Sequence, residues 1–237
     1  MKRLRKQTAK TTKIINGPSR DLDVRGEFLI VFAAALFVLI LKLLLSYVVY
    51  GTNDVTYWKF FSDVIAQHGT FKIYSLVKIY NHPPLMSWVL KFIRYITLKS
   101  GLSFQFVFRL MPIIADFLSI FVIWNLLSAL RVKTRTLLCV ICSINPINFL
   151  ISGFHGNTDS VFIFFIFLAI YFIKNKQIFY SGLCYGLSLC IKIVAIILLP
   201  VFFFYFRTRK EKAIFIAFSA IIPLLVFLPY LLSDFHA

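Results

Sequence analysis

The chain has 237 residues, of which 60% are hydrophobic, and 28 of them are Phe. Its formal net charge of +17 arises from 26 Lys and Arg residues against 9 Asp and Glu residues. This composition excludes an ordinary soluble domain, because soluble domains carry far fewer apolar residues. The basic residues stand mostly in an N-terminal tail and in short clusters between apolar runs, so the charge indicates membrane topology and not binding to nucleic acid.

The first apolar segment is long enough to cross a membrane. Residues 28–50 form an apolar run that Lys42 alone interrupts, and the bilayer core requires about 20 apolar residues in a helix. Residues 1–27 are basic and largely polar, which predicts a cytoplasmic tail. We therefore divide the chain into this tail and one transmembrane module over 28–237.

Three basic clusters follow the tail, and the positive-inside rule places all of them on the cytoplasmic side. The chain must therefore leave and return between one cluster and the next. These crossings predict an all-α polytopic membrane protein with about seven transmembrane helices. The clusters are "RVKTRT" at 131–136, "KNK" at 174–176 and "RTRKEK" at 207–212.

The same rule predicts where the chain turns. Residues 51–103 form an external loop, and the apolar stretch 83–98 lies in it as an interfacial helix, because a crossing there would put the next basic cluster outside. The span 104–130 then returns to the cytoplasmic side. Two hairpins follow, over 137–173 and 178–206, with turns near "GFHGNTDS" and "CIKIV". Their arms of about 15 residues are short for a bilayer, and short helices are tolerated where they line a watery cavity.

This topology brings four ionisable residues to the external face from separate parts of the sequence. They are Asp54, His155, Asp159 and Lys192. Ionisable residues at membrane depth are costly and mark functional or paired positions. The sequence therefore predicts a polar cavity that the external loop and both hairpins share.

Two residues of the external loop are candidates for chemistry. Asp54 lies just past the first span, where a carboxylate can act as a general base on a substrate hydroxyl. The alternative is that Asp54 caps a short helix after Thr52 and Asn53. His82 precedes two prolines, and a structural hydrogen-bonding role is favoured over catalysis.

Three charged residues lie within the later apolar segments. Arg109 and Asp116 are seven residues apart, close to two helical turns, so they share a helix face. For Asp116 we favour a structural partnership with a polar group of another span, whereas Arg109 stands near the external end and could hold a phosphate. Lys192 either extends to the membrane interface or stabilises the charge of a departing phosphate.

The order of five segments, "NDVTYWKFF", "YNHPPLMSW", "RLMPIIAD", "GFHGNTDS" and "KIVAIILLP", resembles the GT-C superfamily of membrane glycosyltransferases. The resemblance covers roughly residues 51–200 and is strongest to the polyprenyl-phosphate-sugar-dependent glucosyltransferases and mannosyltransferases of N-glycan and GPI-anchor type. It implies that Asp54 is the catalytic base and that Lys192 and His155 face the donor phosphate. The further substrate-binding candidates are Asp159, Arg109 and His82.

The resemblance also implies a reaction and a location. We expect transfer of mannose or glucose, with inversion, from a polyprenyl-phosphate-linked donor to an acceptor glycan, lipid or protein at the external or lumenal face. The metal site is unknown: the resemblance specifies no cofactor, and it allows a divalent metal. The membrane is the plasma membrane of a prokaryote or the endoplasmic reticulum, with the N-terminus cytoplasmic. Many relatives have eight or more spans, so the chain is either minimal or incomplete.

Two other classes of function stay open from the residues alone. A transporter or lipid flippase would also place ionisable groups on short helices around a cavity. A non-catalytic membrane scaffold could keep the same fold and bind a partner. The Pro-Pro-Leu element at 83–85 favours the enzyme over the transporter, and Asp54 argues against the scaffold.

Overall fold

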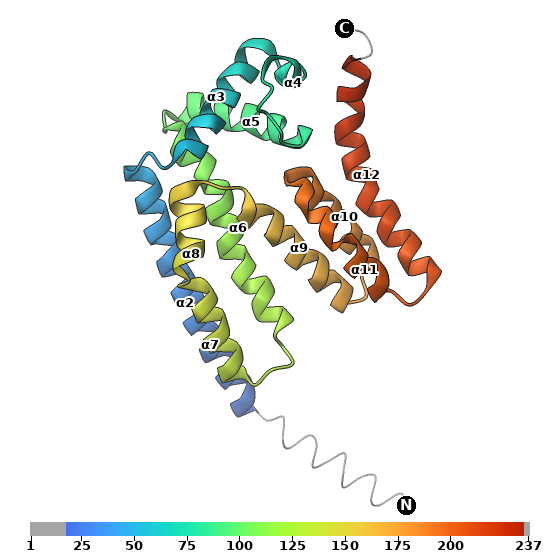
Figure 1. The fold of residues 1–237 in the computed structure, drawn as a ribbon. Helices are drawn as coiled ribbons and strands as arrows, with labels where there is room; N and C mark the ends of the chain where they lie inside the picture. The colour runs from blue at the N-terminus through green and yellow to red at the C-terminus, as the bar shows by residue number, and fades with distance from the viewer. Residues whose placement is uncertain (1–17, 235–237) are drawn as a thin grey trace, which may run out of the picture.

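The computed structural model describes residues 18–234, with side chains from 23 to 233. Over this range the chain forms helices joined by turns, without a strand, which confirms the predicted all-α class (Figure 1). Residues 1–17 of the predicted tail lie outside the described residues. Residues 18–27 belong to the first helix, α2 (Pro18–Val48), and the predicted boundary between tail and transmembrane module stays a prediction. Proline is favourable at a first helical position because its fixed φ suits the helix.

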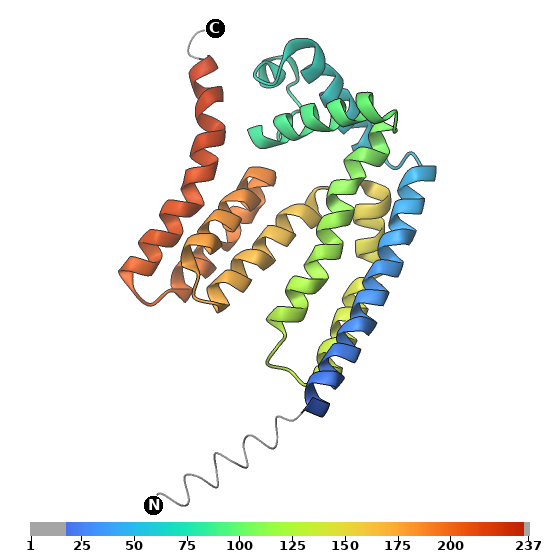
Figure 2. The ribbon, with the colours of Figure 1, turned by 180° about the vertical axis from the view of Figure 1, so that it is seen from behind.

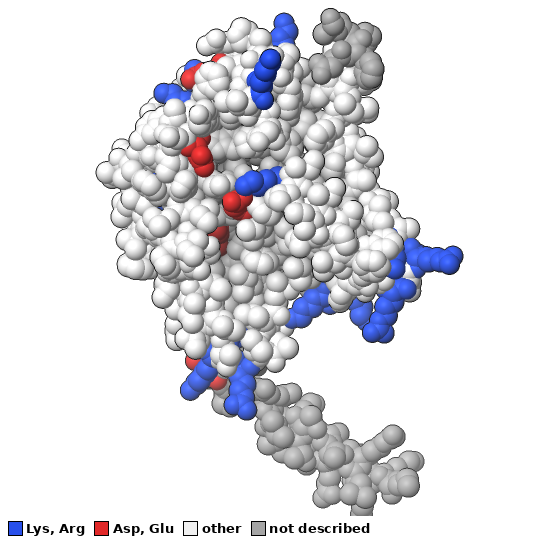
Figure 3. Space-filling view, viewed as in Figure 1, with Lys and Arg blue, Asp and Glu red and all other residues white. Residues whose placement is uncertain are grey.

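The longer helices run between two ends of the molecule (Figures 1 and 2). One end carries the connections at 127–131, 175–177 and 206–208, and Lys and Arg side chains gather there (Figure 3). We call it the basic end, and the opposite end, which carries the loop 51–103, the site end. The predicted alternation of crossings therefore agrees with the structure. The helices on either side of these connections are α6 (Phe104–Leu126), α7 (Val132–Ser143), α9 (Asp159–Lys174), α10 (Ile178–Ile191), α11 (Leu199–Tyr205) and α12 (Arg209–Asp234).

Three helices of the loop 51–103 cover the site end (Figures 1 and 2). They are α3 (Asn53–His68), α4 (Ile73–Leu76) and α5 (Pro84–Ser100). Helix α5 lies across the end of the bundle, in agreement with the interfacial helix predicted for 83–98. It begins at Pro84 and ends at Ser100, and the C-cap residue Gly101, with a positive φ of 70°, closes the helix.

Both predicted hairpins are present, with their turns at the site end (Figure 1). The first rises through α7, the short α8 (Pro146–Asn148) and a π-helix, η1 (Phe149–His155), and then descends as α9. The second rises through α10 to Lys192 and descends through a 3₁₀ segment, η2 (Ile193–Leu198), and α11. The turns at 156–158 and at Lys192 therefore fall where the sequence predicted them.

Within residues 18–234, four helices are long and apolar enough to span a bilayer, which makes the chain an integral membrane protein. The apolar helices Ile178–Ile191 and Ile193–Tyr205 are shorter. The predicted number of seven spans therefore stays a prediction. The four long spans are Asp23–Val48, Phe104–Leu126, Val132–His155 and Arg209–Ser233.

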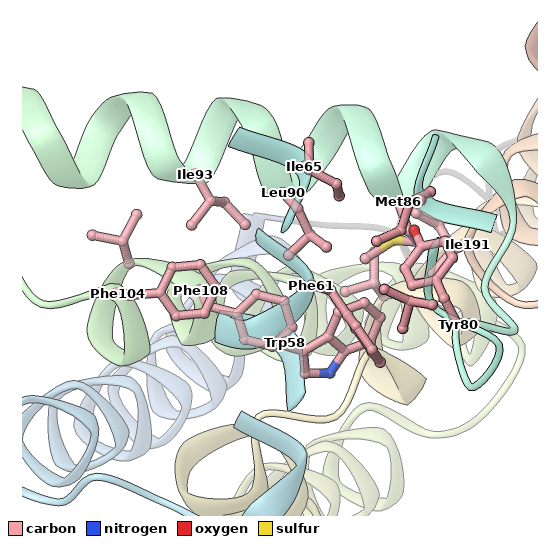
Figure 4. Close-up of a cluster of buried hydrophobic side chains, with 14 of the residues drawn as sticks. Trp58, Phe61, Ile65, Tyr80, Met86, Leu90, Ile93, Phe104, Phe108 and Ile191 are labelled. Carbon is pink, nitrogen blue, oxygen red and sulfur yellow. The ribbon is translucent and has the colours of Figure 1, made fainter. Parts of the chain in front are cut away.

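A buried apolar cluster joins the loop helices to the bundle (Figure 4). Trp58 of α3, Leu90 of α5 and Phe108 of α6 are all at most 5% exposed. Ile191, the last residue of α10, belongs to the same cluster. Because full burial of a large apolar side chain is worth about 1.5–3 kcal/mol, the cluster fixes α3, α5 and the end of α10 relative to one another. Trp58 and Phe61 of this cluster stand on α3, the helix that also carries Asp54.

A buried ion pair joins α2 to α6 at membrane depth. Lys42 and Asp116 are 2.7 Å apart, and their side chains are 4% and 16% exposed. The prediction that Asp116 pairs with a polar group of another span is thereby confirmed. The stem of Lys42 also supports η1, since a Cβ added at Gly153 would lie 3.1 Å from its Cγ. The pair therefore holds three segments of the bundle together.

Helix α10 packs tightly on α12 through two glycines four residues apart. A Cβ at Gly182 would lie 2.8 Å from the carbonyl oxygen of Phe215, and one at Gly186 would lie 2.8 Å from that of Ser219. Small residues at this spacing let two membrane helices approach closely. The sequence analysis missed this signal, although the G-x-x-x-G spacing is visible in "SGLCYGLS".

Candidate functional site

A polar cavity of about 320 Å³ opens at the site end. Helix α3, the segment before α5, the turn before α9 and the end of α10 all contribute to its wall. In the space-filling view, acidic and basic side chains stand close together on an otherwise uncharged part of this face (Figure 3). The lining residues are Asp54, Tyr57, Trp58, Phe61, Ile79, His82, Asn157, Thr158 and Lys192.

Helix α3 supplies one whole face to this cavity. Asp54, Tyr57, Trp58 and Phe61 stand at positions i, i+3, i+4 and i+7, so they lie along one side of the helix. Asp54 was predicted from the sequence and the three aromatic residues were not, although their helical spacing is a signal for them. The alternative role of Asp54 as a helix cap is not seen, because the N-cap position is Thr52 and Asp54 lies within the first turn.

His155 stands beside Asp54. Its Nδ1 atom is 3.5 Å from a carboxylate oxygen of Asp54 and 3.1 Å from the hydroxyl of Thr52. The side chains of Asp54 and His155 are each about half exposed, at 47% and 49%. The structure thus brings together the head of the external loop and the end of η1, as predicted. It places His155 with Asp54 and not with Lys192.

Two glycines make this approach sterically feasible. Gly51 has φ +104°, and a Cβ there would lie 2.8 Å from the carbonyl oxygen of Phe154. Gly156 has φ +67°, and a Cβ there would lie 3.0 Å from side-chain atoms of Val55 and Arg109. Only glycine combines a positive φ with this lack of space. The "HGN" segment therefore requires a glycine at its second position, Gly156, for structural reasons.

Arg109 is not among the residues that line the cavity, and its predicted role in holding a phosphate stays a prediction. Its side chain is completely buried, and its guanidinium donates hydrogen bonds to backbone carbonyls at two helix ends. At the end of α2 the acceptors are residues 46, 49 and 50, and at the end of η1 they are residues 153 and 154. Because its Nε atom also bonds the carbonyl of Gln105, all three guanidinium nitrogens are occupied. Arg109 therefore ties the end of α2, which leads into α3 and Asp54, to the end of η1, which carries His155.

Lys192 forms an ion pair with Asp159 at the edge of the cavity. Their side chains are 33% and 31% exposed. Lys192 follows the last residue of α10 in an extended conformation, and Asp159 is the first residue of α9. The ammonium also lies 5.9 Å from the ring centre of Phe162. Lys192 is therefore held at a turn at the site end, which is not the position of a lysine that extends from the middle of a span.

His82 forms part of the cavity wall between Asp54 and Lys192. Its ring lies 4.1 Å from that of Trp58, centre to centre, and its carbonyl accepts a hydrogen bond from Tyr74. Burial lowers the pKa of the His82 imidazole to about 4, and the charge of Lys192 acts in the same direction, against Asp54. His82 is therefore neutral at physiological pH.

A second cavity, of about 380 Å³, adjoins the first at His82. It lies between the segment before α5, the start of η2 and the last turns of α12. Its wall is mainly aromatic and aliphatic, and exposed apolar residues of η2 and α12 continue from it. The lining residues are Tyr74, Asn81, His82, Pro83, Pro84, Ile193, Phe227, Tyr230 and Leu231.

The described residues contain no group of three or more His, Cys, Asp or Glu side chains that could hold a metal ion. The divalent metal that the sequence analysis allowed therefore stays a prediction. The side chains present are suited to acid–base chemistry and to contact with one anion. Asp54 can accept a proton, and Lys192 can contact a phosphate.

The fold and the site together define a polytopic membrane protein with a polar, partly open cavity at one membrane face. Comparison with known families identifies it further: residues 81–232 match the dolichyl-phosphate-mannose-protein mannosyltransferase family. The match covers more than half of the chain, and the chain belongs to this family. The predicted resemblance to GT-C membrane glycosyltransferases is thereby confirmed.

One curated relative is GPI mannosyltransferase 1 of Kluyveromyces lactis. The two proteins are 34% identical over 119 residues, which cover 50% of this chain and 28% of the relative. The chain thus spans less than a third of the relative's length. No solved structure matches the chain.

Proposed function

We propose that the chain transfers mannose from a dolichyl- or polyprenyl-phosphate-linked donor to an acceptor hydroxyl, in the cavity between Asp54 and Lys192. One observation carries the proposal: a carboxylate and an ammonium from opposite parts of the chain line one cavity at a membrane face. The family match is consistent with this arrangement. It also favours the transferase over the transporter and over the non-catalytic scaffold.

Lys192 is the proposed contact for the donor phosphate. It is the one Lys or Arg among the described lining residues, and Arg109 is occupied elsewhere. A single ammonium suits a phosphodiester, which carries one negative charge, better than a diphosphate. The adjoining apolar cavity starts at Ile193, directly after Lys192, and suits the first isoprene units of the lipid.

Asp54 is the proposed general base. It would remove the proton from the acceptor hydroxyl, whose oxygen then forms a bond to the anomeric carbon while the bond from that carbon to the phosphate oxygen breaks. Attack from the face opposite the phosphate inverts the configuration. The lipid phosphate leaves with the electron pair, and Lys192 stabilises the charge that develops on it. His155, whose Nδ1 atom also contacts the hydroxyl of Thr52, would hold the Asp54 carboxylate in position.

The two related names agree in the sugar and differ in the acceptor. The family and the relative are both named for transfer of mannose, so we propose mannose as the sugar. The two names differ in the acceptor, which is a protein in the first and the GPI anchor in the second. A panel with a Ser/Thr peptide, a GPI-type glycolipid and a free mannoside distinguishes the acceptor classes.

The orientation follows from the charge distribution. We place the basic end in the cytoplasm and the site end on the external or lumenal side, because Lys and Arg near the ends of spans favour the cytoplasm. The membrane is the endoplasmic reticulum or a prokaryotic plasma membrane.

Substitution of Lys192 tests the phosphate site. We expect Lys192→Met to lower turnover with polyprenyl-phosphate-mannose by one to three orders of magnitude, in line with the loss of one charge-stabilising group. Lys192→Arg should restore part of the rate, since a guanidinium presents its donors differently. A folded Met variant with unchanged donor binding and unchanged turnover would remove Lys192 from the mechanism.

A further inference from the structure

The ammonium of Lys192 has a carboxylate partner within the chain itself. Asp159 accepts a hydrogen bond from it, and the pair borders the cavity, with about a third of each side chain exposed. Asp159 is fixed at the first position of α9, where the helix N-terminus favours a negative charge. A phosphate bound to Lys192 would therefore lie close to a second, immobile anion.

The consequence of this anion depends on the charge of the phosphate. The proposed donor is a phosphodiester with one negative charge. Transfer of the sugar converts it into a phosphate monoester, which carries about −1.5 to −2 charges at neutral pH. Repulsion from Asp159 grows with the charge of the ligand, so it acts more strongly on the product than on the donor. Lys192 is the single cation of the described cavity wall, so no second one offsets this repulsion.

We propose that Asp159 is a product-release residue, which weakens the binding of the lipid monophosphate product more than that of the donor. This inference rests on the proposed function and assigns to Asp159 a role opposite to that of a phosphate ligand. Asp159 acts through the charge it places beside Lys192. It takes no part in bond formation.

The test compares two ligands in the full chain, purified in detergent at pH 8. Farnesyl phosphate represents the product, and its methyl diester represents the singly charged donor. We expect Asp159→Asn to tighten the binding of farnesyl phosphate by about tenfold and that of the diester by about threefold, as for a partly exposed charge pair. Steady-state mannosyl transfer should also become limited by product release and show a burst.

Matched variants isolate the effect. Asp63 pairs with Arg94 in the same layer of helices, at a similar exposure and outside the cavity, so Asp63→Asn should leave both affinities unchanged. Asp159→Ser keeps a residue suited to a helix start, and it serves if the Asn variant does not fold. Both variants of Asp159 should give the same difference between the two ligands.

The outcomes separate this inference from the proposed function. If the Asp159 substitutions change the affinity for both ligands by the same factor, or weaken the binding of both, then Asp159 positions Lys192 and the inference is wrong. If the wild-type chain binds neither ligand, or if Lys192→Met binds both as the wild type does, the phosphate site itself is wrong.

Discussion

Replacement of Arg109 by Met separates the two roles that sequence and structure give to this residue. In the structure, its guanidinium bonds three carbonyls at the end of α2 and two at the end of η1, in a fully buried position. Met fills similar space without a donor, so these carbonyls lose their partner. An unpaired buried polar group costs about 1–3 kcal/mol, and relaxation lets some of the carbonyls find other donors. We therefore expect a loss of about 3–5 kcal/mol in the free energy of unfolding.

The assay is unfolding of the purified Arg109→Met and Arg109→Lys variants in detergent, together with binding of farnesyl phosphate to the folded fraction. Lys keeps the charge but cannot reach both helix ends, so we expect it to recover less than half of the lost stability. The binding of farnesyl phosphate should fall less in either variant than in Lys192→Met. A Met variant within about 1 kcal/mol of the wild type, with phosphate binding lost, would refute the structural role and restore the predicted phosphate site.

Three further predictions concern pH, packing and topology. Because the folded pKa of His82 is about 4 and the ordinary value is 6.5, protons bind the unfolded state first as the pH falls, so stability should decrease from about pH 6.5 to about pH 4. Thermal unfolding at pH 7 and pH 5 checks this. The loss of stability between the two pH values should be smaller in a His82→Asn variant than in the wild type, and an equal loss in both would contradict the prediction. Gly182→Leu should force α10 away from α12 and cost about 2 kcal/mol or more, measured in the same way against Leu183→Ala as a control. Single cysteines at Asn157 and Arg209, in a background without the native four, should react with an impermeant reagent at 157 and not at 209. The reverse pattern would invert the proposed orientation.

The path of the chain through the membrane could be predicted from the sequence because a small number of physical constraints is enough to fix it. Basic clusters on one side, with apolar runs between them, leave little freedom in the number of crossings between one cluster and the next. The structure agrees with this reasoning in the turns at 156–158 and Lys192 and in the position of α5 across the end of the bundle. Asp54 and Lys192, which the same reasoning placed together, line one cavity at the site end.

The pairing of charges could not be predicted in the same way. The position of Arg109 along its span can be read from the sequence. Which groups contact its side chain depends on where α2 and η1 end. The π-helix over 149–155 has no clear sequence signal, and it decides that His155 meets Asp54. The choice of Asp159 as partner of Lys192 likewise depends on how α9 packs against α10. Such contacts depend on packing between segments far apart in the sequence, which the spacing of residues does not reveal.

The central claim is that Asp54 deprotonates an acceptor hydroxyl beside a lipid-phosphate donor. A single-turnover assay with polyprenyl-phosphate-mannose and an acceptor from the panel tests it most directly, in the wild-type chain and in Asp54→Asn. The amide keeps the size of the carboxylate and cannot accept the proton, so we predict transfer by the wild type with an inverted anomeric centre, and a rate about a hundred to ten thousand times lower in the variant. Donor binding should be unchanged. An Asn variant that transfers mannose at nearly the wild-type rate, with saturating donor, would contradict the account.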